Sequence, residues 1–138
     1  MSAGHSGVLN RILIVDDDVD LLMLLERKLV KQGFEVETAA SLPEAEEILQ
    51  YFRPHLLLLD INVRGEDGRK LSFKLKQDTT HKGCRIIILS GYDYSASRAA
   101  LFGADELITK PLHLAYLLHR IEHYLFNGSQ GVYEPGPI

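Results

Sequence analysis

The sequence predicts an α/β fold in which helices cover both faces of a doubly wound, five-stranded parallel sheet. Short apolar runs alternate five times with amphipathic stretches along the 138 residues, which is the order that repeated βα units impose. The central run, residues 56–59, is four consecutive leucines between His55 and Asp60. A strand that is apolar at every position is buried on both faces, as in a parallel sheet covered by helices.

The five expected strands are short runs rich in leucine or β-branched residues. The first ends in three aspartates, residues 16–18, and the third ends in Asp60. The fourth ends in Ser90, and the fifth runs into Lys110. We expect the strands at residues 11–15, 34–38, 56–60, 84 or 85 to 89, and 106–108.

The first helix has recognisable ends. Its apolar residues recur at helical spacing between Leu21 and Val30, and Gly33 stops it. Asp18 or Asp20 can cap its start, and we favour a capping role for Asp18 over a metal-ligand role.

The later helices are also predicted from capping residues and from the spacing of apolar residues. Ser41 to Glu44 is a capping box with Pro43 in the first turn, and the last helix carries an apolar face between Leu114 and Leu125. We expect the five helices at residues 21–32, 41–52, 69–77, 95–102 and 113–126, with a loop at residues 62–68.

Composition narrows the class of protein. A net charge of -4 and the lack of a Lys/Arg cluster along the sequence argue against direct binding of nucleic acid or of an anionic membrane. The apolar runs are too short to span a bilayer, and the single cysteine, Cys84, suits a reducing compartment, so we expect a cytoplasmic location. We expect one domain at residues 9–126, between a flexible segment at 1–8 and a flexible tail at 127–138.

Polar residues gather where the strands end. In a parallel sheet all carboxyl ends lie at one edge, so Asp16, Asp17, Asp60, Ser90 and Lys110 are expected to meet there. Three carboxylates at close range repel one another unless a cation neutralises them, and a hard divalent ion such as Mg²⁺ fits oxygen ligands best. With Mg²⁺ bound, one carboxylate can attack phosphorus and form an aspartyl phosphate without a general base.

Four segments carry a resemblance to a known family. Residues 12–18 (ILIVDDD), 56–62 (LLLLDIN), 86–91 (IIILSG) and 103–111 (GADELITKP) resemble, in order, the strand ends of a response-regulator receiver domain. The resemblance covers about residues 9–126. It implies a flavodoxin-like (βα)5 fold with strand order 2-1-3-4-5.

The resemblance also implies roles for the metal-binding residues. Asp17 would bind Mg²⁺ directly and Asp16 through water. Asp60 would share the ion, and Asn62 would offer its backbone carbonyl oxygen.

The resemblance implies the phosphoryl-binding residues as well. Asp60 would be phosphorylated, and Ser90 and Lys110 would bind the phosphoryl group. The Lys110–Pro111 peptide bond is expected to be cis, since cis peptides occur at X-Pro bonds.

Two positions depart from the family pattern. Arg64 and Gly65 replace the proline that usually follows the phosphorylated aspartate, so we expect a more mobile loop. Leu107 stands where the family commonly has an aromatic residue that reports phosphorylation. We therefore expect intact phosphorylation chemistry, with output through backbone or helix shifts.

The function that we expect is that of a phosphoacceptor signalling domain rather than an enzyme. It would take a phosphoryl group from the phosphohistidine of a histidine kinase or phosphotransfer protein and then change its affinity for an unknown downstream partner. We expect a monomer or weak dimer, either free-standing or part of a larger regulator or hybrid kinase. The alternatives are a phosphatase-like hydrolase with an aspartate nucleophile, for which Asn62 replaces the usual second aspartate, and a phosphorylation-silent pseudo-receiver.

Overall fold

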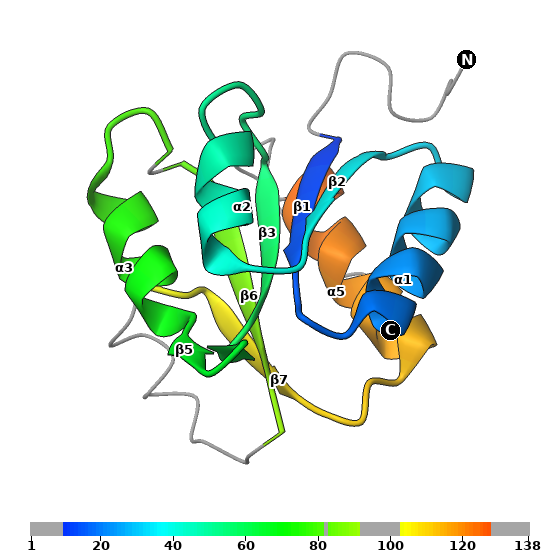
Figure 1. The fold of residues 1–138 in the computed structure, drawn as a ribbon. Helices are drawn as coiled ribbons and strands as arrows, with labels where there is room; N and C mark the ends of the chain where they lie inside the picture. Colours follow the sequence, from blue (N-terminus) through cyan, green and yellow to red (C-terminus); the bar gives the residue numbers. More distant parts are fainter. Residues whose placement is uncertain (1–9, 82, 92–102, 128–138) are drawn as a thin grey trace.

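Five parallel strands form the centre of the protein (Figure 1). The computed structural model describes residues 10–81, 83–91 and 103–127. The sheet order is β2-β1-β3-β6-β7, which confirms the predicted order because β6 and β7 are its fourth and fifth strands along the chain. The strands are β1 (Arg11–Val15), β2 (Glu35–Ala39), β3 (Leu56–Asp60), β6 (Arg85–Ser90) and β7 (Glu106–Thr109).

Helices cover both faces of this sheet, as predicted (Figure 1). Two helices pack on one face, α1 (Val19–Lys31) and α5 (Leu114–Glu122), and their buried leucine and isoleucine side chains meet one set of strand residues. The other face carries α2 (Leu42–Ile48) and α3 (Arg69–Gln77), which meet the alternate residues of the same strands. The expected helix at 95–102 and the segments 1–8 and 128–138 lie outside the described residues.

The core is the run of apolar strand residues that the sequence indicates. All five residues of β3 are buried, and its four leucines are completely inaccessible to solvent. Leu57 and Leu59 belong to the cluster under α2 and α3, and Leu56 and Leu58 to the cluster under α1 and α5. A strand in this position has no solvated face, which is why it shows no alternation of polar residues.

Side-chain caps fix where α1 and α2 begin. The Asp18 side chain accepts a hydrogen bond from the backbone N–H of Leu21 at 3.1 Å, which confirms its capping role. Ser41 Oγ accepts from the N–H of Glu44 at 3.2 Å, and the Glu44 carboxylate accepts from the N–H of Ala40 at 2.8 Å. Gly33, with φ of 102°, follows the end of α1.

The predictions for one loop and for the ends of two helices were wrong. The segment 62–68 is not simply a loop, because Asn62–Val63 (β4) and Glu66–Asp67 (β5) pair as a short antiparallel ladder. The second helix ends at Ile48 rather than near residue 52; residues 49–51 form turns, and Phe52 beyond them is buried. The last helix gives way to a π-helical turn at residues 123–127, η2, which holds Leu125 in the core.

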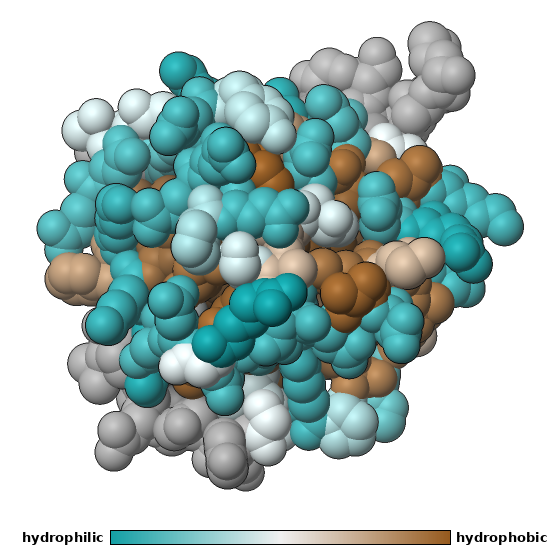
Figure 2. Space-filling view, viewed as in Figure 1, coloured by the Kyte–Doolittle hydropathy of each residue, from teal (hydrophilic) through white to brown (hydrophobic). Residues whose placement is uncertain are grey.

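The surface is mainly hydrophilic on the face shown in Figure 2, with apolar side chains among the polar ones. Helix α1 carries several large apolar residues that are about half exposed, namely Val19, Met23, Leu24 and Val30. Within the described residues, no helix is both long enough and apolar enough to cross a membrane.

Candidate phosphoacceptor site

Four neighbouring strands deliver polar side chains to one edge of the sheet. Asp16 follows β1, Asp60 ends β3, Ser90 ends β6 and Lys110 follows β7. The strand register aligns these ends. Val15 pairs with Leu59, Leu59 pairs with Ile88, and Ser90 pairs with Thr109. The predicted meeting of these residues at the carboxyl edge therefore holds in the structure.

Three carboxylates lie together at this edge. One oxygen from each of Asp16, Asp17 and Asp60 lies within 4.8 Å of the others. Asp16 and Asp60 are buried and Asp17 is exposed, so the cluster opens to solvent on the Asp17 side. In the part of the chain that the structure describes, this is the group of carboxylates suited to hold a metal ion.

Lys110 is the cation that faces this cluster. Its Nζ lies 3.0 Å from Asp16 Oδ2 and 3.6 Å from Asp60 Oδ1. The Lys110 backbone N–H donates to the carbonyl oxygen of Ser90 at 2.6 Å, which ties the lysine to the end of β6. The Lys110–Pro111 peptide bond is cis, as predicted.

A contact that the sequence did not reveal joins the β4–β5 ladder to the cluster. The backbone N–H of Arg64 donates to Asp17 Oδ2 at 2.7 Å, and Arg64 has a positive φ of 53°. The Arg64 side chain extends to Ala40, whose carbonyl oxygen accepts from Nε at 2.9 Å. Arg64 and Gly65, the departure from the family pattern, therefore sit in a defined turn that orients Asp17.

Asn62, Ser90 and Leu107 occupy the places that the sequence predicts. Asn62 is exposed beside the cluster, and its side-chain oxygen accepts from the N–H of Gly65 at 3.1 Å. Ser90 is completely buried at the end of β6. Leu107 already packs against the core, in register with Ile88.

The close packing of charges shifts the pKa values of Asp60 and Lys110. Burial, reinforced by the charge of Asp16, raises the pKa of the Asp60 carboxyl, although Lys110 and the N–H of Asn62 oppose the shift. Burial on its own would lower the pKa of Lys110, but Asp16 and Asp60 outweigh it and raise that pKa. One ammonium group does not balance three carboxylates at this range, so the cluster retains an attraction for further positive charge.

The residues present fit a magnesium ion. Mg²⁺ takes oxygen ligands, is bound by a small number of carboxylates, and keeps water or phosphate oxygens in its remaining positions. Asp16 is held by the N–H of Asp18 at 2.9 Å as well as by Lys110, so two fixed contacts set its orientation. The exposed side of the cluster leaves space for the remaining ligands.

Comparisons with known proteins agree with this geometry. The family model described as response regulator receiver domain matches residues 12–122. The chain is 34% identical over 113 residues to response regulator PleD from Caulobacter vibrioides, covering 80% of this chain and 25% of PleD. The chain thus spans about a quarter of the length of this relative.

Solved structures show the same fold. A CheY-like receiver domain protein from Methanospirillum hungatei JF-1 superimposes with a TM-score of 0.76 and 32% identity, covering 83% of this chain and 92% of that protein. Response regulator TrrA from Thermotoga maritima, solved in complex with Mg²⁺-BeF, gives a TM-score of 0.73 and 28% identity, covering 84% of this chain and 99% of TrrA.

Proposed function

The chain belongs to the response regulator receiver domain family, and from this premise we propose that Asp60 is the residue that accepts the phosphoryl group. Receiver domains are regulatory phosphoacceptors of two-component systems. The observation that carries the assignment is the position of Asp60, buried at the end of the central strand with its carboxylate 3.6 Å from Lys110 Nζ.

The other two carboxylates are less suited to the nucleophilic role. Both oxygens of Asp16 are engaged, one by the N–H of Asp18 and one by Lys110. Asp17 is exposed and oriented by the Arg64 N–H. These two aspartates are better placed to hold a cation than to attack phosphorus.

The transfer needs little chemistry from the protein itself. An Asp60 carboxylate oxygen forms a bond to the phosphorus of a phosphohistidine, and the P–N bond breaks with its electron pair going to the imidazole of the donor. The Lys110 ammonium and the Ser90 hydroxyl bind the oxygens of the phosphoryl group as it arrives. Asp60 needs no general base while it is ionised; burial raises the pKa of its carboxyl, and the charge of Lys110 opposes that rise.

Mg²⁺ is the cofactor that we assign to the acidic cluster, where it would supply charge neutralisation for the phosphoryl oxygens. Asp17 would bind the ion directly and Asp16 through water, and Asp60 and the backbone carbonyl of Asn62 would be the remaining protein ligands. The clustered carboxylate oxygens of the three aspartates support this assignment.

The donor is a histidine kinase or a phosphotransfer protein in the cytoplasm, and the chain acts as a monomer or weak dimer. The half-exposed apolar residues of α1 support a docking role for this helix, because α1 begins directly after the acidic residues. A protein bound there brings its phosphohistidine close to Asp60. Phosphorylation then changes binding of a downstream partner through backbone or helix shifts, since Leu107 cannot signal by turning an aromatic ring inward.

Acetyl phosphate labelling tests this proposal. With Mg²⁺, intact mass should show a gain of one phosphoryl group, which disappears with EDTA and in Asp60→Asn. Asp18→Asn is the matched control, because it removes a neighbouring carboxylate that caps α1. Labelling of Asp60→Asn equal to the wild type would refute the assignment. Release of many equivalents of acetate per protein, without lasting phosphorylation, would instead indicate the phosphatase-like alternative.

A further inference from the structure

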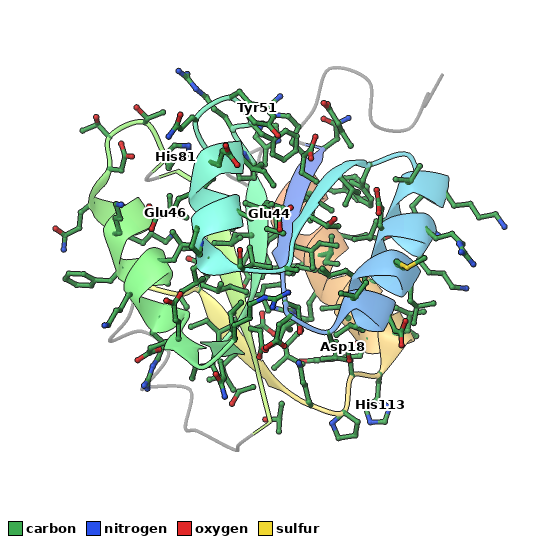
Figure 3. The ribbon with its side chains drawn as sticks, viewed as in Figure 1. Asp18, Glu44, Glu46, Tyr51, His81 and His113 are labelled. Atoms are coloured by element: carbon green, nitrogen blue, oxygen red, sulfur yellow. The ribbon has the colours of Figure 1, made fainter. Side chains whose placement is uncertain are left out.

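A pocket lies at the edge of the sheet opposite the acidic cluster, where the strands begin. It has a volume of about 350 Å³, and we call it the arginine pocket after Arg11, Arg53 and Arg85, which line it together with His55, His81 and Tyr124. Arg11 and Arg85 are the first residues of β1 and β6, and Arg53 and His55 precede β3. Figure 3 shows the two ends, with Asp18 on the side of the acidic cluster and His81 on the other.

The charge of the arginine pocket has one sign. Three guanidinium groups and two imidazoles line it, and none of the described residues that form its wall carries a carboxylate. The chain as a whole has a net charge of -4, so this grouping runs against the average field of the protein. The like charges of Arg11 and Arg53 repel one another, and a bound anion would relieve that repulsion.

The guanidinium groups keep free donors. Arg11 donates from Nε to the carbonyl oxygen of Arg53 at 2.7 Å. Its two terminal nitrogens make no hydrogen bond with the described residues and can donate to a ligand. The exposed Arg53 guanidinium has no hydrogen bond or ion pair among the residues that the structure describes. Arg85 is partly neutralised, because one terminal nitrogen lies 3.3 Å from Asp105 Oδ1.

The two histidines of the pocket each have a ring nitrogen, Nε2, that is available to a ligand. His55 Nδ1 accepts hydrogen bonds from the backbone N–H groups of Asn10 and Arg11, both at 3.1 Å, so its ring proton is placed on Nε2. His81 is buried, its Nδ1 lies 3.2 Å from Asp78 Oδ2, and its Nε2 has no partner within the described residues. A buried ring nitrogen without a hydrogen-bond partner is uncommon in a native protein structure.

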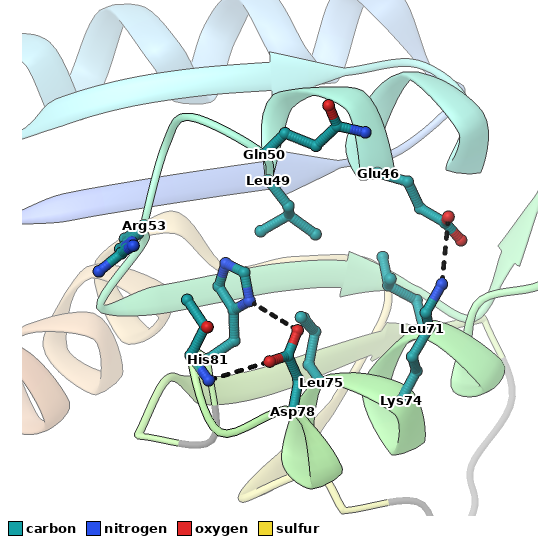
Figure 4. A pocket seen from close by; sticks show the side chains of 10 residues that line it. Glu46, Leu49, Gln50, Arg53, Leu71, Lys74, Leu75, Asp78 and His81 are labelled. Atoms are coloured by element: carbon teal, nitrogen blue, oxygen red, sulfur yellow. Dashed lines mark hydrogen bonds and ion pairs between the residues drawn. The ribbon is translucent and has the colours of Figure 1, made fainter.

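A groove adjoins the arginine pocket and shares Arg53, Thr80 and His81 with it. This groove has a volume of about 430 Å³, lies between α2 and α3, and has Leu49, Leu71 and Leu75 in its wall. In the close-up of Figure 4, the His81 ring lies between Arg53 and Asp78, beneath Leu49. The groove wall also carries Glu46, Lys74 and Asp78, and the two carboxylates are paired with Lys74 and His81 respectively. The two cavities together therefore offer a cationic end and an end of mixed apolar and paired charged residues.

We propose that the arginine pocket binds the phosphate group of a small phosphorylated molecule, whose organic part lies in the groove between α2 and α3. Guanidinium forks match phosphate oxygens in geometry and charge. The pocket volume falls within the range of about 300–1,000 Å³ that small-molecule sites occupy. This site is separate from Asp60, since the two lie at opposite edges of the sheet.

Amide NMR spectra of the full chain, titrated with inorganic phosphate and with phenyl phosphate in EDTA, test the proposal. We expect saturable shifts at Asn10, Arg11, His55 and Arg85, with phenyl phosphate binding more tightly than phosphate. Shifts confined to residues beside Asp60 and Lys110, or shifts that do not saturate, would overturn it. Equal binding of the two probes would overturn the assignment of the groove.

A charge-matched pair of variants makes the test specific. Arg53→Gln should weaken phosphate binding about tenfold, as expected for loss of one charge-assisted contact. Its guanidinium is exposed and makes no hydrogen bond or ion pair with the described residues, so the fold should be retained. Arg27→Gln removes the same charge from the exposed surface of α1 and should leave phosphate affinity unchanged. Equal affinities of the two variants would refute the proposal.

Discussion

The acidic cluster and the arginine pocket lie at opposite edges of one sheet and are lined by side chains of opposite charge. At the carboxyl edge, Asp16, Asp17 and Asp60 face one lysine, Lys110. At the amino edge, arginines surround a cavity whose described wall has no carboxylate. The strands themselves provide burial and register, and the residues at their two ends determine which ion each edge attracts.

The edges also differ in how their polar groups are held. Lys110 and Asp16, which are 94 residues apart in the sequence, contact each other directly, so the acidic edge is a set of coupled side chains. At the amino edge, His55 and Arg11 bond mainly to nearby backbone groups. Mutations at the acidic edge should therefore change chemistry, whereas mutations at the amino edge should change stability or anion binding.

Lys110→Met should give the largest effect. It removes the cation beside Asp60 and Asp16, and loss of one preorganised donor to a developing charge slows a reaction by roughly 10²–10³-fold. Time courses of acetyl phosphate labelling read by mass would measure this. Lys74→Met, which removes the exposed pair with Glu46, is the control. A rate for Lys110→Met equal to that of Lys74→Met would contradict the role of Lys110.

Mg²⁺ should raise the melting temperature, and Asp17→Asn should abolish most of that rise. An ion that binds only the native state stabilises it by about 2.7 kcal/mol at a hundred times its Kd. In EDTA, Asp17→Asn should be at least as stable as the wild type, since it relieves repulsion within the cluster. Differential scanning fluorimetry with and without Mg²⁺ checks both statements. An unchanged Mg²⁺ response in Asp17→Asn would remove this residue from the metal site.

Asp18→Ala should separate the capping aspartate from its neighbours. Loss of the hydrogen bond to the Leu21 N–H should lower the free energy of unfolding by about 1 kcal/mol. Urea unfolding would measure that loss, and the Mg²⁺-dependent phosphorylation should persist. If labelling disappears while the protein stays folded, Asp18 has a role in the site itself.

The smallest predicted effect is a pH dependence at the amino edge. Burial, together with the charge of Arg11, lowers the pKa of His55 below 6.5. The unfolded chain then binds the proton more readily, so this contribution to stability is complete above pH 6.5 and is lost as the pH falls toward the folded pKa. His55→Gln should flatten the decline seen by urea unfolding between pH 7 and pH 5.5. Part of the slope should remain, because the pKa of His123 is lowered too. A slope identical to the wild type would contradict the role of His55.

The acidic site could be predicted because strand ends are visible in the sequence. Asp16, Asp60 and Lys110 each follow an apolar run. Parallel strands bring such residues to one edge of the sheet, independently of the length and conformation of the loops. The same rule applied to strand starts would have brought Arg11 and Arg85 together. The sequence shows no Lys/Arg cluster because these arginines are isolated along the chain, and the cluster exists only at the amino edge of the folded sheet.

Short and irregular features could not be predicted in this way. The β4–β5 ladder has two residues in each strand, too few to show a period, and its turn places a non-glycine residue, Arg64, at positive φ. The contact between the Arg64 N–H and Asp17 depends on that turn. The π-helical turn at residues 123–127 likewise keeps a helical pattern of apolar residues, so the sequence predicts an unbroken last helix.

The location of the phosphoryl group tests the central claim most directly. Borohydride reduces an aspartyl phosphate to homoserine, so reduction of the protein labelled with acetyl phosphate and Mg²⁺, followed by tandem mass spectrometry, identifies the acceptor. The structure predicts homoserine in place of Asp60, with Asp16 and Asp17 unmodified. Homoserine in place of Asp16 or Asp17, or at a residue away from the carboxyl edge, would contradict the claim that Asp60 is the acceptor.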